Sequence, residues 1–185
     1  MNVEYSELNK SDAKNLMKLR LSVLETDPYS FSVTVEEEKQ ASLENVESAI
    51  ESYKKSSDRL MLGAWEDGLS GVVGVERYGN EIEKHKVRLW GPYVNRSIRG
   101  NGVGTCLIEK ALEFAFTIEG VEMVTLETIS ESSSAISLFN KHGFERTGVQ
   151  NRALCYEGKY ADLIYMQKIN QHNQALELTR GTLVL

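Results

Sequence analysis

The sequence has few of the features that mark membrane, metal-binding or disulfide-stabilised proteins. Its 185 residues include two cysteines and two prolines, and no apolar run approaches the roughly 18 residues of a membrane span. Cys106 and Cys155 lie far apart without a cysteine or histidine at ligand spacing, so neither zinc nor a disulfide framework is predicted. The first residues mix glutamates with apolar residues rather than forming a leader. We therefore expect a cytoplasmic protein of bacterial type, with no metal and no membrane partner.

Positive charge is also outweighed by negative charge. Lysine and arginine total 21 against 27 aspartates and glutamates, and the net charge is -6. Nucleic-acid binding needs clustered cations to neutralise phosphates, so that function is disfavoured, whereas a cationic or amine substrate is mildly favoured. The length and the 41% apolar content predict one domain over residues 1–169. Residues 170–185 are interpreted as a C-terminal tail, with an extra strand or a homodimer contact as the alternative.

The periodicity of apolar residues predicts an α/β fold with a largely antiparallel sheet. One helix follows a cap at Ser11-Asp12 and stops before Pro28, and a second covers about 42–56. Between them, residues 27–38 are interpreted as part of a substrate-side lid. The other predicted elements are strands at 3–6, 60–66, 71–78, 86–94, 123–128, 144–152 and 159–169, with helices at about 102–118 and 132–141.

A glycine-rich turn carries the most chemical information. Gly100, Gly102 and Gly104 join the strand end at Tyr93-Val94 to a helix. Bare backbone amides and a helix N-terminus form a site for an anion such as a phosphate, although an ordinary strand-to-helix turn is the alternative. The residues after Gly104 are Thr105 and Cys106, so the lysine of a P-loop is missing, and the dinucleotide fingerprint does not fit either.

The turn reads R-x-x-G-x-G from Arg99 to Gly104, and with it the chain resembles the GCN5-related N-acetyltransferase (GNAT) superfamily. The run Ala135–Phe144 and the segment Gly158–Asp162 recur in that superfamily in the same order. The resemblance covers residues 60–169 strongly. It implies a mixed, mostly antiparallel sheet of about six to seven strands, splayed at a coenzyme A site and flanked by about four helices.

The resemblance also implies acetyl-CoA as cosubstrate. Its pantetheine arm would lie along the strand end, and its pyrophosphate on the amides of the turn, with the Arg99 guanidinium as a flexible charge at the rim. Thr105 is either a phosphate ligand or a first-turn residue. The implied cofactor-binding residues are Tyr93, Val94, Arg99, Gly100, Asn101, Gly102, Val103, Gly104, Thr105, Ser132 and Phe139.

Two of these positions depart from the family pattern. Ser132 replaces the usual asparagine and either makes one hydrogen bond or only caps its helix. Phe139 replaces the tyrosine that is commonly assigned to protonate the leaving thiolate, and we expect it to pack against the thioester arm. Because a thiol pKa near 8.5 already makes a fair leaving group, the loss slows the reaction rather than forbidding it.

The sequence does not single out one general acid or one general base. Tyr156 is the first candidate for the acid, and Tyr160 and Tyr165 are further candidates. The alternative is that all three are half-buried aromatic residues of strands. A lysine-like amine of pKa about 10.4 must lose a proton before it attacks. Glu76 is the first candidate base. Glu127 and His85 follow as weaker candidates, and a Cys155 acyl-enzyme is weakly supported.

The sequence therefore predicts an enzyme that transfers acetyl from acetyl-CoA to a primary amine by direct attack in a ternary complex. The acceptor is a small molecule, amino acid, peptide or protein. A non-catalytic acyl-CoA binding module, and an acyltransferase with another acyl donor or a hydroxyl acceptor, are the alternatives. Tyr29 and Phe31 are interpreted as an apolar substrate wall or as contacts of the lid.

Overall fold

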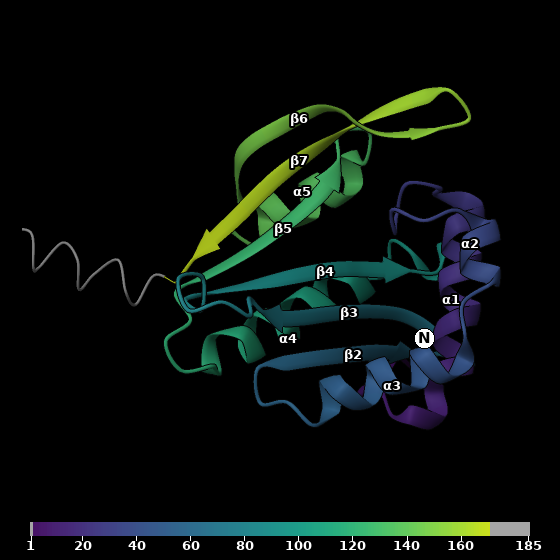
Figure 1. The fold of residues 1–185 in the computed structure, drawn as a ribbon, viewed down its shortest axis with the longest axis horizontal. Helices are drawn as coiled ribbons and strands as arrows, with labels where there is room; N and C mark the ends of the chain where they lie inside the picture. Colours follow the sequence, from purple (N-terminus) through teal and green to yellow (C-terminus); the bar gives the residue numbers. More distant parts are fainter. Residues whose placement is uncertain (1, 171–185) are drawn as a thin grey trace, which may run out of the picture.

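The structure, a computed structural model, describes residues 2–170 and is built around a seven-stranded sheet (Figure 1). The strands are β1 (Glu4–Glu7), β2 (Arg59–Trp65), β3 (Leu69–Arg77), β4 (Lys86–Val94), β5 (Met123–Ile129), β6 (Glu145–Tyr156) and β7 (Lys159–Ile169). Their spatial order is β1-β2-β3-β4-β5-β7-β6, and only β4 and β5 pair in parallel. The predicted mixed, mostly antiparallel sheet is confirmed. The proposed tail or strand at 170–185 lies outside the described residues except for Asn170.

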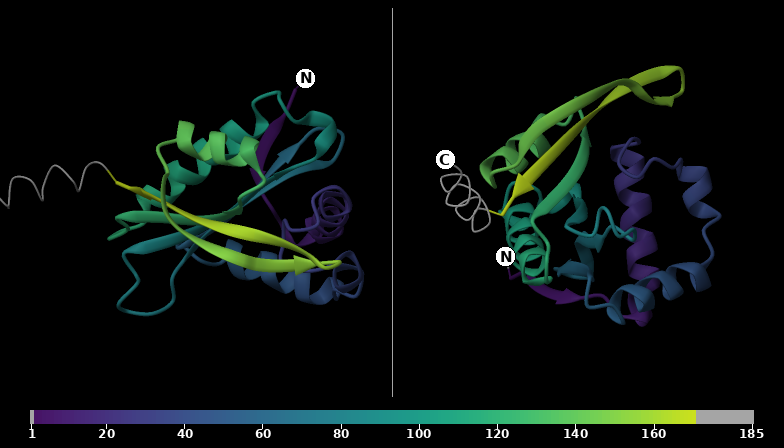
Figure 2. Two further views of the ribbon diagram at one scale, coloured as in Figure 1. Left: turned by 90° about the horizontal axis from the view of Figure 1, so that it is seen from above. Right: turned by 60° about the vertical axis from the view of Figure 1, so that its left-hand side comes forward.

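Helices cover both faces of the sheet (Figures 1 and 2). They are α1 (Ala13–Thr26), α2 (Val35–Lys39), α3 (Leu43–Lys54), α4 (Val103–Thr117) and α5 (Ser133–Lys141). Side chains of α4 and α5 form one hydrophobic core with the sheet, and those of α1 and α3 form the other. On β3, Val72 enters the second core and Val73 the first, because successive strand residues point to opposite faces. Within residues 2–170 no helix is long and apolar enough to cross a membrane.

The structure differs from the predicted elements at α2 and β6. The five-residue α2 lies inside the expected lid, where Thr34 accepts a hydrogen bond from the Glu37 amide and Glu37 bonds back to Thr34. Such a short helix shows no apolar period, and residues 2–170 therefore contain five α-helices where about four were expected. The strand β6 continues to Tyr156 through a register irregularity after Gln150, because pairing with β7 extends it beyond its local pattern.

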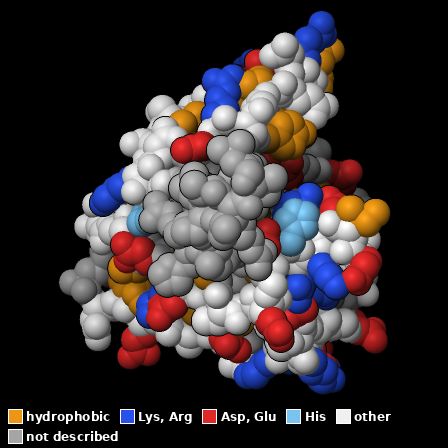
Figure 3. All heavy atoms as spheres, turned by 90° about the vertical axis from the view of Figure 1, so that its left-hand side faces the viewer, with side chains coloured by type: hydrophobic (Ala, Val, Ile, Leu, Met, Phe, Trp, Pro, Cys, Tyr) orange, Lys and Arg blue, Asp and Glu red, His pale blue; other side chains and the backbone are white. Residues whose placement is uncertain are grey.

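The surface at the left-hand end of Figure 1 mixes charges of both signs. Figure 3 shows acidic and basic side chains interspersed over the described part of this face. Such a mixed distribution is typical of a water-exposed surface. The features that could bind a ligand lie instead around the opening of the central sheet.

Candidate functional site

The two central strands pair over a short distance and then separate. Residues 86–88 of β4 pair with residues 123–125 of β5. Beyond that point the described part of β4 pairs with β3, and β5 pairs with β7, so the strands diverge (Figure 1). Within residues 2–170, the facing edges of the gap carry backbone N–H and C=O groups without a strand partner. An extended polar ligand can satisfy those groups as an added strand would.

A bulge in β4 bends the strand at the gap. Val72 pairs with Tyr93 and Gly74 with Trp90, so two residues of β4 oppose one residue of β3. Gly91 in this bulge has φ +83°, and a Cβ there would lie 2.9 Å from the Val72 carbonyl oxygen. Glycine is therefore required, both by the backbone angle and by the close approach of β3.

A cavity of about 820 Å³ occupies the gap, between the segment after α1, strand β4, the start of α4, the start of α5 and the end of β5. The predicted cofactor residues line it, with the exception of Asn101. They are Tyr93, Val94, Arg99, Gly100, Gly102, Val103, Gly104, Thr105, Ser132 and Phe139. The side-chain amide of Asn101 instead donates to the carbonyl oxygens of Ile98 and Arg99, at 3.1 and 3.3 Å. These bonds stabilise the conformation of the turn.

The glycine turn has the geometry of an anion site. Gly100 and Gly102 have φ near +80°, and Gly102 is the N-cap of α4. The first amides of α4 have no carbonyl partner within their own helix, and the helix dipole adds positive potential. A Cβ at Gly104 would lie 3.2 Å from Leu138 of α5, so this glycine allows α4 and α5 to approach. The turn thus combines bare amides with a tightly packed helix start.

The structure differs from the prediction at Arg99. Instead of a flexible charge at the rim, the guanidinium donates from Nε to the Val94 carbonyl oxygen at 2.9 Å and pairs with Asp27 at 2.6 Å. Asp27 follows α1, so the ion pair joins the segment after α1 to the glycine turn. The sequence offered no sign of this contact, because 72 positions separate its partners.

Glu76, the first candidate base, lies in a fixed network at the cavity wall. Its Oε1 pairs with Arg59 at 3.0 Å, and its Oε2 accepts from the Tyr53 hydroxyl at 3.1 Å. Trp90 Nε1 donates to the same hydroxyl at 3.1 Å. Burial raises the pKa of Tyr53 to about 12, so the phenol stays protonated at neutral pH. Tyr53 and Trp90 were not among the predicted site residues.

The other proton-handling candidates are scattered. Glu127 lines the cavity, whereas His85 precedes β4 and its carbonyl oxygen accepts from the backbone amides of Glu122 and Met123 at the start of β5. Tyr156 lies outside the cavity lining, and the nearby charge of Glu157 raises its pKa. Cys155 is exposed on β6, also away from the lining.

Two further tyrosines were considered as acids. Tyr160 is 51% exposed beneath the Arg152 guanidinium. The hydroxyl of Tyr165 donates to Gln150 at 2.7 Å. Neither lines the main cavity.

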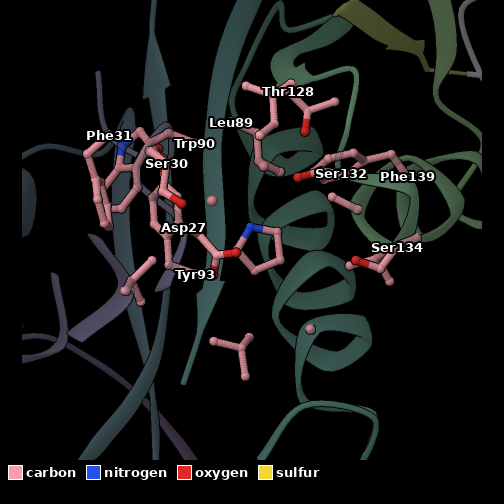
Figure 4. Close-up of a pocket in the computed structure, with 18 of the residues that line it drawn as sticks. Asp27, Ser30, Phe31, Leu89, Trp90, Tyr93, Thr128, Ser132, Ser134 and Phe139 are labelled. Carbon is pink, nitrogen blue, oxygen red and sulfur yellow. The ribbon is translucent and has the colours of Figure 1, made fainter. Parts of the chain in front are cut away.

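The helix α5 supplies the opposite wall. Phe139 is 3% exposed and packs edge-on against Phe144, with ring centroids 5.8 Å apart. Ser132 occupies the N-cap position of α5 without a side-chain capping bond. Figure 4 shows Ser132 and Phe139 on one side of the cavity, facing Trp90 and Phe31 on the other.

Aromatic residues fix the segment between α1 and α2. Phe31 packs on Tyr93 with ring centroids 3.9 Å apart, and the Tyr93 hydroxyl donates to the Ser30 carbonyl oxygen. The Tyr29 hydroxyl donates to the carbonyl oxygen of Lys159 in the β6–β7 hairpin at 3.1 Å. Both predicted wall residues, Tyr29 and Phe31, line the cavity.

Metal ligands do not gather in this part of the molecule. Across residues 2–170, no group of three or more histidine, cysteine, aspartate or glutamate side chains is arranged to hold an ion. The polar groups of the cavity are instead amides, hydroxyls, carboxylates, guanidinium groups and the ammonium group of Lys141.

Comparisons with known proteins agree with this geometry. The chain is similar to a GNAT-family acetyltransferase structure from Streptococcus pneumoniae, with 26% identity and a TM-score of 0.82 over 91% of this chain and all of that one. It is also similar to yncA from Salmonella typhimurium, solved with its cofactor acetyl-CoA, at 19% identity and a TM-score of 0.78 over 91% and 94% of the two chains. An uncharacterized protein of Mycobacterium leprae is 33% identical over 106 residues, which are 55% of this chain and 26% of that protein. The chain thus spans about a quarter of that relative.

The family assignment rests on a longer match. Residues 20–144 match the acetyltransferase (GNAT) family. This span runs from within α1 through the glycine turn to just beyond α5, and it includes two of the segments on which the resemblance was based, the glycine turn and the run Ala135–Phe144, but not Gly158–Asp162. The chain therefore belongs to the acetyltransferase (GNAT) family.

Proposed function

We propose that this protein transfers an acetyl group from acetyl-CoA to a primary amine by direct attack in a ternary complex. The observation that carries the proposal is the opening of β4 from β5, which leads directly into the glycine turn at the start of α4. Unpaired strand edge suits the amide groups of a pantetheine arm. The amides of the turn and the helix dipole suit a pyrophosphate. These residues therefore fit acetyl-CoA.

The thioester supplies the activated acetyl group, and the protein supplies position and charge. In this proposal the unpaired edge of β4, residues 89–94, orients the arm. Residues 99–105 bind the phosphates, and Phe139 excludes water beside the arm. Holding two reactants in attacking geometry is itself worth several kcal/mol of barrier, about 7 or more in favourable cases.

An amine acceptor agrees with the charges near the gap. Carboxylates at Glu76 and Glu127 line the cavity beside the aromatic ring of Trp90. Anionic and aromatic groups attract an ammonium ion, and a carboxylate can accept its proton before the attack. Glu76 is already held by Arg59 and Tyr53. We therefore assign Glu127 as the acceptor of the proton and Glu76 as the group that holds Tyr53 in place.

The experiment measures free thiol release from acetyl-CoA with a panel of amines, and detects the acetylated products by mass. Thr105→Glu tests the cofactor half, because Thr105 lines the cavity in the first turn of α4. A glutamate is favourable at that end of a helix but repels a bound phosphate. We expect the KM for acetyl-CoA to rise about 10- to 100-fold with an unchanged Tm, since one added unit of repulsion is worth roughly 1 to 4 kcal/mol.

Thr105→Gln is the matched control, with the same size and no charge. It should keep the KM for acetyl-CoA within about threefold of the wild-type value. Equal effects of glutamate and glutamine would place the phosphates elsewhere. A panel that includes alcohols and longer acyl-CoA donors tests the alternatives of a hydroxyl acceptor and another acyl group.

Phe139 favours a second candidate function, a module that binds acyl-CoA without turnover. Its ring is buried and cannot donate a proton to a leaving thiolate. Acetyl-CoA binding without thiol release across the whole panel would support this candidate. Phe139→Tyr separates the two, because a restored phenol should raise kcat about 10-fold or more in an enzyme and should leave a binding module inactive.

A further inference from the structure

The charged side chains around the cavity are mostly paired with each other. Three ion pairs account for them, at distances of 2.6, 2.6 and 3.0 Å: Arg20–Glu38, Arg99–Asp27 and Arg59–Glu76. Among the described residues, three charged groups in the lining have neither a hydrogen bond nor an ion pair: Arg88, Glu127 and Lys141. Lys141 belongs to α5, which packs on the other face of the sheet from α1 and α3. Arg88 and Glu127 therefore remain on the face of α1 and α3.

Arg88 lies where the central strands separate. It is the last residue of β4 that pairs with β5, opposite Thr125, and its partner on β3 is Glu76. Its neighbours Val87 and Leu89 enter the core with α4, so the Arg88 side chain emerges on the face that carries Trp90. Glu127 follows Thr125 by two positions and shares that face.

Arg88 and Glu127 also border a second, smaller cavity of about 260 Å³. Its walls carry the hydroxyl groups of Tyr78 and Thr125, which are hydrogen-bonded to each other at 3.0 Å. The two unpaired charges thus stand between the main cavity and a small polar chamber. An acceptor that enters the gap from this face meets one cation and one anion.

A tyrosine bridge limits the size of that acceptor. Tyr29, from the segment after α1, bonds to the Lys159 carbonyl oxygen and packs edge-on against Tyr156 at 6.4 Å. These contacts link the segment after α1 to the β6–β7 hairpin. A small molecule fits beneath such a bridge more readily than a folded protein surface.

We propose that the acceptor is a small amino acid, and that Arg88 binds its carboxylate while Glu127 faces its amino group. This inference rests on the proposed acetyl transfer. The planar guanidinium forms two parallel hydrogen bonds to a carboxylate, which positions the ligand as well as binding it. A simple amine leaves Arg88 without a partner and places a second positive charge near the guanidinium, and like charges repel. Arg88 therefore selects for the carboxylate.

The test uses matched acceptors: a set of amino acids, their carboxamides and the amines obtained by removing the carboxylate. We expect wild-type kcat/KM to favour each amino acid over its amine by about 100-fold or more. Arg88→Met should remove most of that preference, mainly by raising the KM for the amino acid, and should leave the KM for acetyl-CoA unchanged. Arg88→Lys should restore part of it, because a lysine keeps the charge without the planar fork.

Arg146→Met is the matched control, since Arg146 is an exposed arginine of β6 outside both cavity linings. It should retain the wild-type preference. An equal preference for amines and amino acids, or a preference that survives Arg88→Met, overturns the assignment of Arg88.

A binding experiment distinguishes failure of this inference from failure of the proposed acetyl transfer. Calorimetry measures binding of the same acceptors to the protein saturated with coenzyme A. Amino-acid binding that is lost in Arg88→Met supports the inference even without turnover. Absence of any such binding in the wild type overturns it.

Discussion

The packing of Trp90 on Gly74 leads to a sharp prediction about stability and acceptor binding. A Cβ built at Gly74 would lie 1.9 Å from Cε2 of the indole, 2.2 Å from Cζ2 and 2.3 Å from Nε1. Ordinary van der Waals contact begins at 3.4 Å, so Gly74→Ala must displace the ring by roughly 1.5 Å. The displacement breaks the bond from Trp90 Nε1 to the Tyr53 hydroxyl.

The expected cost follows from three terms. Overpacking costs about 1 to 3 kcal/mol, and loss of the hydrogen bond adds about 0.5 to 1.5 kcal/mol. Replacing a strand glycine by alanine raises the free energy of unfolding by about 0.5 to 1 kcal/mol. Gly74→Ala should therefore lower the free energy of unfolding by about 2 kcal/mol. In a Trp90→Ala background the same change should stabilise the protein by about 0.5 kcal/mol, because the obstructing ring is gone.

Urea denaturation of the two single variants and the double variant measures this coupling. A non-additivity of about 2 kcal/mol or more is expected, well above the roughly 0.5 kcal/mol seen for independent sites. Gly79→Ala is the control, because nothing lies within 4 Å of its added Cβ, and its effect should not depend on Trp90. Equal costs of Gly74→Ala in both backgrounds would refute the reasoning. The single variant Gly74→Ala, which keeps Trp90, should also show a higher KM for the acceptor. Its KM for acetyl-CoA should stay near the wild-type value.

Three other changes test the ion pairs and the buried phenol. Arg20→Met should destabilise the protein by about 3 kcal/mol or more, because it leaves the buried Glu38 carboxylate unpaired. The double variant that also carries Glu38→Leu should regain most of that stability, as measured by its denaturation midpoint. Asp27→Asn should lower the KM for acetyl-CoA two- to threefold by removing a negative charge beside Arg99, with less than about 1 kcal/mol lost from this half-exposed pair; a higher KM would contradict this. The pKa of Tyr53 rises from 10.0 to about 12 on folding, so the folded state retains a proton that the unfolded state loses, and stability should fall as pH rises through that interval. Tyr53→Phe should flatten the fall in urea titrations, whereas an unchanged slope would rule out this contribution.

The parts of the fold that the sequence predicted correctly are those with local signals. Strands β4 and β7 begin and end where predicted, and α4 differs by one residue at each end. The turn Asp67-Gly68 between β2 and β3 has the positive φ values that its residues favour. The glycine turn before α4 could be located for the same reason, because its spacing is itself the signal.

The acceptor side could not be predicted, because its contacts join distant positions. Tyr53 lies 23 positions from Glu76 and 37 from Trp90, and no short pattern links them. The contact between Gly74 and Trp90 arises from strand register, which the sequence constrains only weakly for glycine-rich strands. Glu76 was recognised as a candidate base, but the two partners that hold it were not.

The cavity also changes how the missing tyrosine acid is understood. Its three lining tyrosines are Tyr29, Tyr53 and Tyr93, and each hydroxyl already donates a hydrogen bond to a carbonyl or carboxylate oxygen. Tyr93 resembles Tyr53 in that burial raises its pKa to about 12. A phenol held in this way is poorly placed to give its proton to a thiolate, and Phe139 has none to give. In the proposed reaction the thiolate therefore leaves unassisted or takes its proton from water. Its pKa of about 8.5 permits this near neutrality, and deprotonation of the amine, with a pKa about two units higher, becomes the more demanding proton transfer. The carboxylates beside the gap then handle the more demanding of the two proton transfers, and a phenol at position 139 would assist the other.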